Sequence, residues 1–127
     1  MTQPVPPKLR LRLVIETGPV GTLSFGPGKA DLLDLIGQQG SISAAAARAM
    51  GMSYRRAWLL VDEMNQTFRN PLVESVRGGP QGGGARLTED GKAALRYFRK
   101  IEAATINAGA AEIAALSAML RDISDGK

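Results

Sequence analysis

The first hydrophobic pattern along the chain has the period of a β-strand. Leucine or isoleucine recurs at every second position from Leu9 to Ile15, and the positions between them are basic except for Val14. Such alternation predicts a strand with one buried face. Glycine and proline then gather at residues 17–21, which predicts a turn, and residues 22–25 can return as a second strand. We therefore expect an N-terminal β-hairpin over residues 8–25.

From Lys29 onward the apolar positions follow the period of an α-helix instead. The apolar face of this helix consists of Leu32, Leu33, Leu35 and Ile36. Asp31 and Asp34 are expected near its N-terminal end, where the helix dipole favours negative charge. Gly40 is expected to end it.

Two further helices are predicted by their capping residues. Ser43 can accept a backbone N–H bond at the start of a short helix over residues 44–50. Gly51 ends that helix, because glycine adopts the left-handed conformation without a Cβ clash. Ser53 can cap the next helix, which is expected to run to about Phe68.

The chain then changes from helix to strand and back. Residues 72–76 and 85–87 are predicted to be strands on either side of the glycine-rich run 78–84. Thr88 can cap a helical tract that continues to residue 124. The apolar stripe of so long a helix usually needs a partner that buries it. Alternatively, Gly109 can divide the tract into two helices.

This order of elements predicts an α+β fold that is mainly α, a winged helix-turn-helix occupying residues 1–127 as one domain. Its core is expected over residues 29–87 and a helical extension over 88–124. Where the two short helices cross, the first needs a small side chain, and Ala47 is placed to provide it. The remaining packing positions are Ala46, Met50, Met52, Ala57 and Leu60. An ordinary pair of packed helices is the alternative.

Composition narrows the classes of function. The chain has 127 residues, 44% of them hydrophobic and 22% charged, which is typical of one folded domain with an extension. It contains no cysteine and no histidine, so thiolate nucleophiles, the usual general base and the common zinc ligands are missing. We expect no enzymatic activity, no metal and no cofactor. The N-terminus has no apolar signal segment, and no apolar run reaches 18 residues, which predicts a cytoplasmic protein that does not bind membranes.

Charge points to a polyanionic partner. The formal net charge is +4, and residues 69–100 alone hold seven basic and three acidic side chains. A local excess of basic residues favours binding to nucleic acid, because neutralised phosphates release their counterions. A solvated basic face is the alternative interpretation. The acidic residues form no site that the sequence supports.

The helix after Gly51 is the candidate for reading DNA. If it is buried through Ala57, Leu60 and Met64, its start is exposed. Arginine can bond guanine bidentately in the major groove, and a hydroxyl can bond a base or a phosphate. Trp58 is expected in the core or at its rim.

The glycine run lacks the Gly-Lys-Ser/Thr ending and the βαβ unit of a nucleotide-binding loop. As the tip of a hairpin flanked by two arginines, it can follow the DNA backbone or enter the minor groove. An inert loop is the alternative. The predicted DNA-contacting residues are Ser43, Ser53, Tyr54, Arg55, Arg56, Arg77, Gly78, Gly79, Gly82, Gly83 and Arg86.

Several short motifs together resemble the N-terminal DNA-binding domain of the ModE family of molybdenum-responsive regulators. The motifs are GSIS at 40–43, MSYRRAW at 52–58, EMNQ at 63–66, LVE at 72–74, GGPQGGG at 78–84 and LTEDG at 87–91. The resemblance covers roughly residues 8–105. It implies a homodimer, formed through the N-terminal strands and the long helix, that binds a near-palindromic double-stranded DNA operator and regulates genes for molybdate transport or molybdenum cofactor.

The sequence also departs from this family. Full-length members continue into molbindin-like domains that bind the oxyanion, whereas this chain ends at Lys127. We therefore expect any response to molybdate to act through a partner. The alternatives are a DNA-binding regulator unrelated to molybdenum, and a protein-interaction module that uses the same face of the fold.

Overall fold

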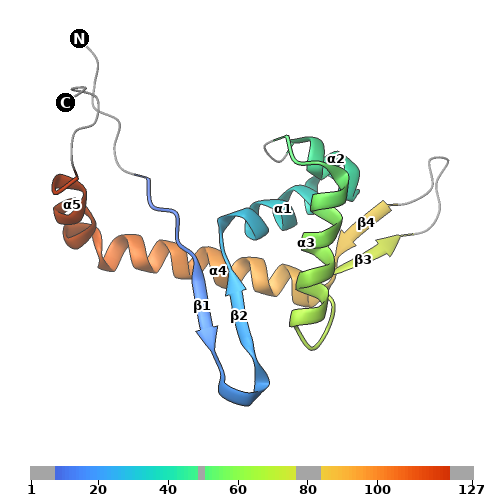
Figure 1. Cartoon of the computed structure of the whole chain (residues 1–127). Helices are drawn as coiled ribbons and strands as arrows, with labels where there is room; N and C mark the ends of the chain where they lie inside the picture. The colour runs from blue at the N-terminus through green and yellow to red at the C-terminus, as the bar shows by residue number, and fades with distance from the viewer. Residues whose placement is uncertain (1–7, 49–50, 77–83, 121–127) are drawn as a thin grey trace, which may run out of the picture.

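Two β-hairpins and a set of helices make up the chain, as the computed structural model shows (Figure 1). The structure describes residues 8–48, 51–76 and 84–120. In chain order the elements are β1 (Leu13–Glu16), the 3-10 turn η1 (Gly18–Val20), β2 (Thr22–Phe25), α1 (Pro27–Gln39), α2 (Ile42–Arg48), α3 (Tyr54–Thr67), β3 (Val73–Val76), β4 (Gly84–Leu87), α4 (Glu89–Ala108) and α5 (Ala110–Ala118). None of the described helices is long and apolar enough to cross a membrane.

The hydrophobic core lies where α1, α2, α3 and the start of α4 meet the β3–β4 hairpin. Its largest fully buried side chains are Leu32, Leu33, Ile36, Met64, Leu72 and Phe98. Burial of a side chain of this size contributes about 1.5–3 kcal/mol, so these six positions dominate the stability of the domain. The predicted apolar face of α1 is confirmed at three of its four positions, and Leu35 is partly buried against the core.

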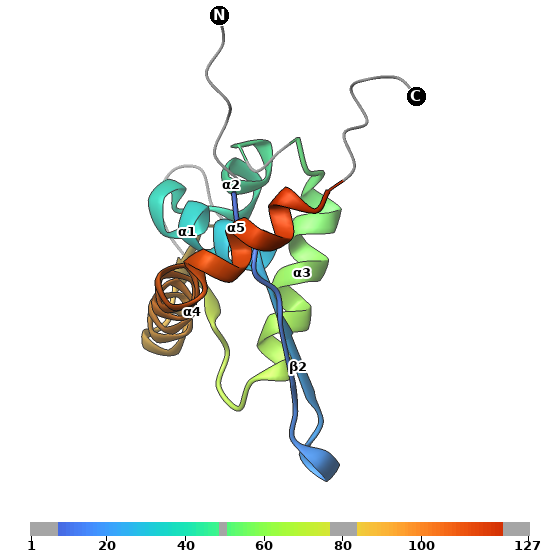
Figure 2. The same ribbon diagram turned by 90° about the vertical axis from the view of Figure 1, so that its left-hand side faces the viewer.

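The N-terminal hairpin reaches away from this core (Figures 1 and 2). β1 and β2 pair antiparallel, with Leu13 opposite Phe25 at the inner end. Phe25 attaches the hairpin to the core by edge-on packing against Phe98, with ring centroids 5.2 Å apart. Burial alternates from residue 8 to residue 13 as the sequence predicts, but the strand begins only at Leu13, and Ile15 is exposed because nothing in the described chain covers the outer end of the hairpin.

Helix α1 differs from the prediction at its start. It begins at Pro27, not near Lys29, because proline has the backbone angle that the first helical position requires. Asp31 therefore lies beyond the first turn, and it binds Arg99 of α4 at 2.8 Å rather than serving the helix dipole. The predicted end is confirmed, since Gly40 is left-handed with φ of 76°.

Helix α2 starts two residues earlier than expected. Ser41 Oγ, not that of Ser43, accepts the N–H of Ala44 at 3.0 Å, because Ser41 directly follows the turn at Gly40 and Ser43 is already inside the first turn. Among the predicted packing residues, Ala47 is wrong, because it is exposed and Ala45 is buried in its place. Ala46 and Ala57 are confirmed as buried, and Met52 and Leu60 are partly buried against the core. Met50 lies outside the described residues.

Helix α3 follows the prediction closely. Gly51 is left-handed with φ of 67°, and Ser53 Oγ accepts the N–H of Arg56 at 3.1 Å. The helix ends at Thr67, within one residue of the expected end. Its buried positions are Ala57, Val61 and Met64, while Leu60 is partly buried.

The second hairpin is tied to the end of α1. β3 and β4 pair antiparallel from Val73 opposite Leu87 to Val76 opposite Gly84. The N–H of Ala85 donates to the carbonyl of Gly40 at 2.9 Å. This bond fixes the base of the hairpin beside the turn between α1 and α2.

The C-terminal tract is divided at Gly109, the second of the two possibilities left by the sequence. Thr88 caps α4 as predicted, since its Oγ1 accepts the N–H of Gly91 at 3.0 Å. Helix α5 leaves the axis of α4 at a large angle (Figure 2) and ends at Ala118. The predicted residues 121–124 lie outside the described part of the chain.

Candidate nucleic-acid interface

The start of α3 presents three adjacent side chains to solvent. Because the helix is buried through Ala57, Val61 and Met64, Tyr54, Arg55 and Arg56 are exposed. The Ser53 hydroxyl also lies at the surface and still has its own O–H to donate, although its oxygen accepts the capping bond. This end of α3 therefore offers two guanidinium groups, two hydroxyl donors and the positive end of a helix dipole.

These residues do not all face the same way. Tyr54 lines a groove of about 560 Å³ between α2, α3 and the β3–β4 hairpin, together with Ser43. Ser53 and Arg56 instead line a cleft on the other side of α3, which the N-terminal segment closes. Arg55 lies between these two surfaces. The sequence identified the residues but not this division.

Trp58 was expected in the core or at its rim, and the structure excludes the core position. It is 46% exposed and lines the same groove as Tyr54, one helical turn away. The reason is periodic, because residues four apart share a helix face and Tyr54 is on the exposed side. An indole and a phenol thus stand together at the edge of the candidate interface.

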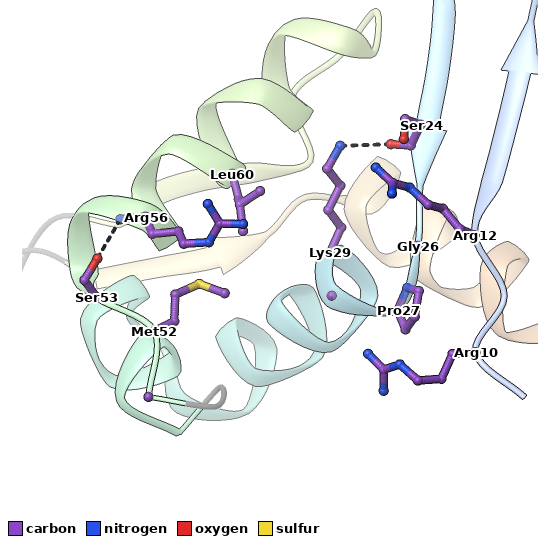
Figure 3. Close-up of a pocket in the computed structure, with 12 residues that line it drawn as sticks. Arg10, Arg12, Ser24, Gly26, Pro27, Lys29, Met52, Ser53, Arg56 and Leu60 are labelled. Carbon is purple, nitrogen blue, oxygen red and sulfur yellow. Dashed lines mark hydrogen bonds between the residues drawn. The ribbon is translucent and has the colours of Figure 1, made fainter. Parts of the chain in front are cut away.

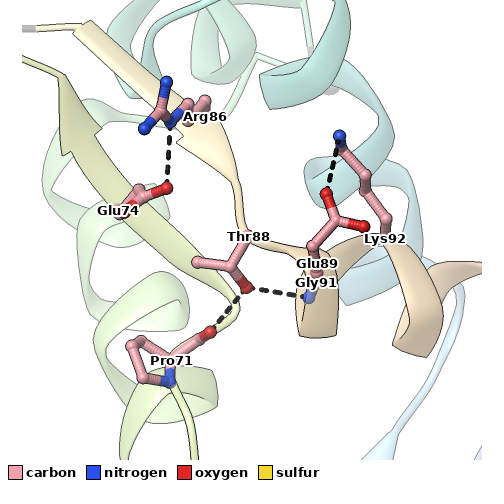
Figure 4. A network of polar contacts seen from close by, with 7 residues as sticks. All are labelled: Pro71, Glu74, Arg86, Thr88, Glu89, Gly91 and Lys92. Carbon is pink, nitrogen blue, oxygen red and sulfur yellow. Dashed lines mark hydrogen bonds and ion pairs between the residues drawn. The ribbon is translucent and has the colours of Figure 1, made fainter.

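The β3–β4 hairpin contributes one described cation. Arg86 is exposed, and its Nε donates to Glu74 Oε2 on the neighbouring strand at 2.9 Å (Figure 4). Exposed pairs of this kind contribute little to stability, so the guanidinium can exchange its partner for a phosphate at small cost. The other predicted residues of this hairpin, Arg77, Gly78, Gly79, Gly82 and Gly83, lie outside the described residues.

Asn65 joins α3 to β3. Its Oδ1 accepts the N–H groups of Leu72 and Val73 at 2.9 and 3.2 Å, and its Nδ2 donates to the carbonyl of Val73 at 3.0 Å. One side chain thereby satisfies three backbone groups where the strand begins. The hairpin is oriented relative to α3 by this contact.

A second polar network holds the start of α4 against β3 (Figure 4). Thr88 Oγ1 donates to the carbonyl of Pro71 at 2.7 Å while it caps α4. A Cβ at Gly91 would overlap the carbonyl group of Leu72, so only glycine fits there. Asn65, Thr88 and Gly91 belong to the EMNQ and LTEDG motifs, and their role here is to fix the geometry around the interface.

Ion pairs neutralise part of the basic stretch 69–100. Arg99 binds Asp31 of α1 at 2.8 Å and Glu102 at 3.0 Å. The hydrogen bond that Arg99 donates to Asp31 raises the pKa of Arg99, and Glu102 adds to this against the opposing effect of partial burial. Lys92 pairs with Glu89, which is already one of the three acidic side chains counted in the stretch. Because Asp31 and Glu102 lie outside the stretch, the pairing of Arg99 lowers its net positive charge.

Sequence reasoning missed the basic residues of the N-terminal segment. Arg10 and Arg12 line the same cleft as Arg56, although more than forty positions separate them along the chain (Figure 3). The available signal was that basic residues occupy the outward positions of the first alternating segment. Within the described ranges no three histidine, cysteine or carboxylate side chains come together as a metal site.

Part of the chain is similar in sequence to known proteins. The chain is 42% identical over 88 residues to the molybdenum-pterin-binding protein MopA of Rhodobacter capsulatus, covering 69% of this chain and 33% of that protein. It is 38% identical over 91 residues to the molybdenum transport protein ModE of Azotobacter vinelandii, covering 72% and 33%. It is 43% identical over 72 residues to the DNA-binding transcriptional dual regulator ModE of Escherichia coli K12, covering 57% and 27%.

These proteins are homologues of the chain. The match spans a third or less of the length of each relative. No family model matches the chain. The homology accordingly concerns a region of the relatives, and what the whole relatives do is carried over only as a proposal.

Proposed function

We propose that the chain is a sequence-specific regulator of transcription that binds double-stranded DNA through a winged helix-turn-helix. In this assignment α2 and α3 form the helix-turn-helix, and the β3–β4 hairpin is the wing. The observation that carries the proposal is the exposed start of α3, where Tyr54, Arg55 and Arg56 stand free of the core while Asn65 holds the wing in a fixed relation to the same helix.

The proposed roles follow from chemistry and position. Arg55 is the best placed to enter the major groove, because it lies at the middle of the exposed arc of α3 and a guanidinium matches guanine N7 and O6. Ser43 and Tyr54 offer hydroxyls to the adjacent backbone. Arg86 adds a cation from the wing, and Arg77 with Gly78, Gly79, Gly82 and Gly83 complete the proposed wing contacts.

We propose that molybdenum metabolism is the regulated process. The names of the relatives support this, since they are described as a molybdenum-pterin-binding protein, a molybdenum transport protein and a transcriptional regulator. The proposed target genes serve molybdate transport or molybdenum cofactor. We assign any molybdate response to a partner.

Dimerisation through the C-terminal helices belongs to the same proposal. The described part of α5 buries none of its residues, and Leu116, Met119 and Leu120 are among the most exposed apolar side chains of the chain. A second copy that covers this stripe would place two α3 helices on one duplex, as a near-palindromic operator requires.

The groove lined by Tyr54 and Trp58 favours a second candidate function, binding to a protein. Aromatic residues are enriched at protein interfaces because they combine apolar area with a polar group. In this alternative the fold associates with a partner protein through the same face. Retained self-association without affinity for any duplex would select it.

The proposal is tested by binding to labelled duplexes from upstream of the gene and its neighbours, in competition with random duplex and at several salt concentrations. Arg55→Ala is expected to weaken binding to the selected site by about 1–3 kcal/mol. Arg96→Ala is the matched control, because Arg96 is an exposed arginine of α4 lying over the ring of Tyr97 at 5.6 Å. Equal affinity for selected and random duplexes would contradict the proposal.

A further inference from the structure

A cleft of about 590 Å³ separates the N-terminal segment from the start of α3 (Figure 3). Its floor is the beginning of α1, at Gly26, Pro27 and Gly28. Arg56 reaches in from α3, Arg10 and Arg12 lie on the opposite side, and Lys29 stands between them. None of the described residues that line the cleft is acidic. Four cations therefore share one concave surface.

The four cations are not equivalent. Lys29 is largely buried, and its Nζ donates to the carbonyl of Ser24 at 2.9 Å and pairs with Glu63 at 2.5 Å. Its charge is thus already balanced, and it serves to hold α1 against β2 and α3. Arg10, Arg12 and Arg56 form no ion pair with any residue of the described ranges. Three guanidinium groups are left for a ligand.

The floor of the cleft adds to the positive potential. Gly26 gives α1 no side-chain cap, and Pro27 has no N–H. The first turn therefore presents the backbone N–H groups of Gly28 and Lys29, which have no partner inside a helix. Gly28 and Lys29 both line the cleft, and a Cβ at Gly28 would meet nothing within 4 Å, so the space beside the first turn is open there. The helix dipole favours an anion at this position.

We propose that this cleft binds a tetrahedral oxyanion of the phosphate class. Arginine suits such a ligand because its planar fork can bond two oxygens at once, and three forks from two sides can satisfy several oxygens of one tetrahedron. The cleft holds this ligand on the side of α3 away from Tyr54. It is therefore distinct from the proposed base-reading surface around Arg55.

Two sources share this chemistry, a phosphate of the DNA backbone and a free inorganic anion. The first rests on the proposed function, because Arg56 and Ser53 belong to the end of α3 that is placed at the duplex. The second is independent of DNA. The two are distinguished by measuring each ligand separately on the same variants.

The variants are Arg12→Ala and the double change Arg10→Ala with Arg12→Ala, with Arg96→Ala as the control. Inorganic phosphate and sulfate are titrated by calorimetry at low ionic strength, and duplex affinity is measured against salt concentration. If the ligand is a backbone phosphate, each lost contact makes the negative slope of log affinity against log salt shallower by about 0.9. If it is a free anion, the double variant loses at least tenfold in phosphate affinity while Arg96→Ala does not.

Gly28→Asp tests the cleft without removing any packed side chain. A carboxylate in the first turn of α1 is favourable to the helix dipole, and it brings a negative charge into the open space beside Gly28, where it competes with a bound anion. We expect the thermal stability of this variant to be unchanged or raised. If the ligand is a free anion, the variant loses its affinity for phosphate. If the ligand is a backbone phosphate, the slope of log duplex affinity against log salt becomes shallower by about one. This pairing separates a filled site from a misfolded protein.

The outcomes are decisive in each arm. A changed salt slope without phosphate binding assigns the cleft to the DNA backbone, and phosphate binding that the variants abolish assigns it to a free anion. Unchanged salt slope and absent or unaltered phosphate binding in all three variants would overturn the proposal. A wild-type chain that binds phosphate but no duplex would refute the proposed function and leave the cleft assignment standing.

Discussion

Apolar side chains recur at similar spacing in the first half of α4 and in its continuation into α5, but they are buried only in the first region. Gly91 and Phe98 are buried, and Ala94 and Leu95 pack against the core. Between Arg99 and the end of the described residues at Leu120, the exposed large apolar side chains are Ile101, Ile106, Leu116, Met119 and Leu120. The spacing specifies a helix in both regions, whereas the presence of a partner surface decides whether the stripe becomes core.

The largest loss of stability is expected at Gly91, where the backbone of α4 approaches the backbone of Leu72. Gly91→Val places a branched side chain against the carbonyl of Leu72, where even one Cβ does not fit, so we expect loss of cooperative folding. Gly37→Ala is the control, because a Cβ there makes ordinary contact with Leu87 at 3.5 Å, and alanine is the better helix former by about 0.5–1 kcal/mol. Thermal melting by circular dichroism measures both. A folded Gly91→Val chain with an unchanged midpoint would contradict the contact.

A pair of truncations on α4 compares its two regions directly. Phe98→Ala is expected to lower the free energy of unfolding by about 3–5 kcal/mol, since Phe98 is 2% exposed and packs on Phe25. Ile106→Ala is expected to cost less than about 1 kcal/mol at low protein concentration, where Ile106 is half-exposed. Urea unfolding gives both values. Similar losses at low concentration would show that the second region has a core of its own.

Self-association of the chain tests whether the second region, from Ile101 through α5, is a dimer interface. Ile106→Asp with Leu116→Asp is expected to weaken self-association at least tenfold, because burial of one such side chain is worth about 1.5–3 kcal/mol. Leu59→Asp makes the same chemical change on α3, where Leu59 is 48% exposed, and is expected to leave association intact. Sedimentation equilibrium distinguishes them. A dimer unaffected by the double change would place the interface elsewhere.

The smallest effect concerns a single cap. Ser41→Ala is expected to lower stability by about 1 kcal/mol, because it removes the acceptor for the N–H of Ala44. Ser43→Ala is expected to change the free energy of unfolding by less than about 0.5 kcal/mol, since the Ser43 side chain is exposed and caps nothing. Chemical unfolding of the two variants side by side decides which serine starts α2.

Features that depend on neighbouring residues were predictable from the sequence. The helix end at Gly40, the left-handed conformation of Gly51 and the caps at Ser53 and Thr88 follow from local backbone chemistry, and all four are confirmed. The exposure of Tyr54, Arg55 and Arg56 at the start of α3 was also predictable, because a helix that is buried on one side exposes the other. Such features need no knowledge of what packs against them.

Choices between equivalent local candidates were not predictable. Ser41 and Ser43 are both capping residues, and the run of alanines from 44 to 47 gives no sign of which members face α3. The cleft was missed for a related reason. Arg12 and Arg56 come together only when the N-terminal hairpin packs beside α1, and the pairing of Arg99 with Asp31 spans 68 positions.

The hydrogen bonds of Asn65 also bear on the order of events during folding. They close loops of only seven or eight residues, whereas the bond between Arg99 and Asp31 closes one of 68. Short loops close with a smaller loss of entropy, so the α3–β3 junction is expected to form early and the docking of α4 onto α1 late. Asn65→Ala should then slow refolding, while Arg99→Ala should mainly speed unfolding. The β3–β4 hairpin would therefore be oriented on α3 before α4 docks onto α1.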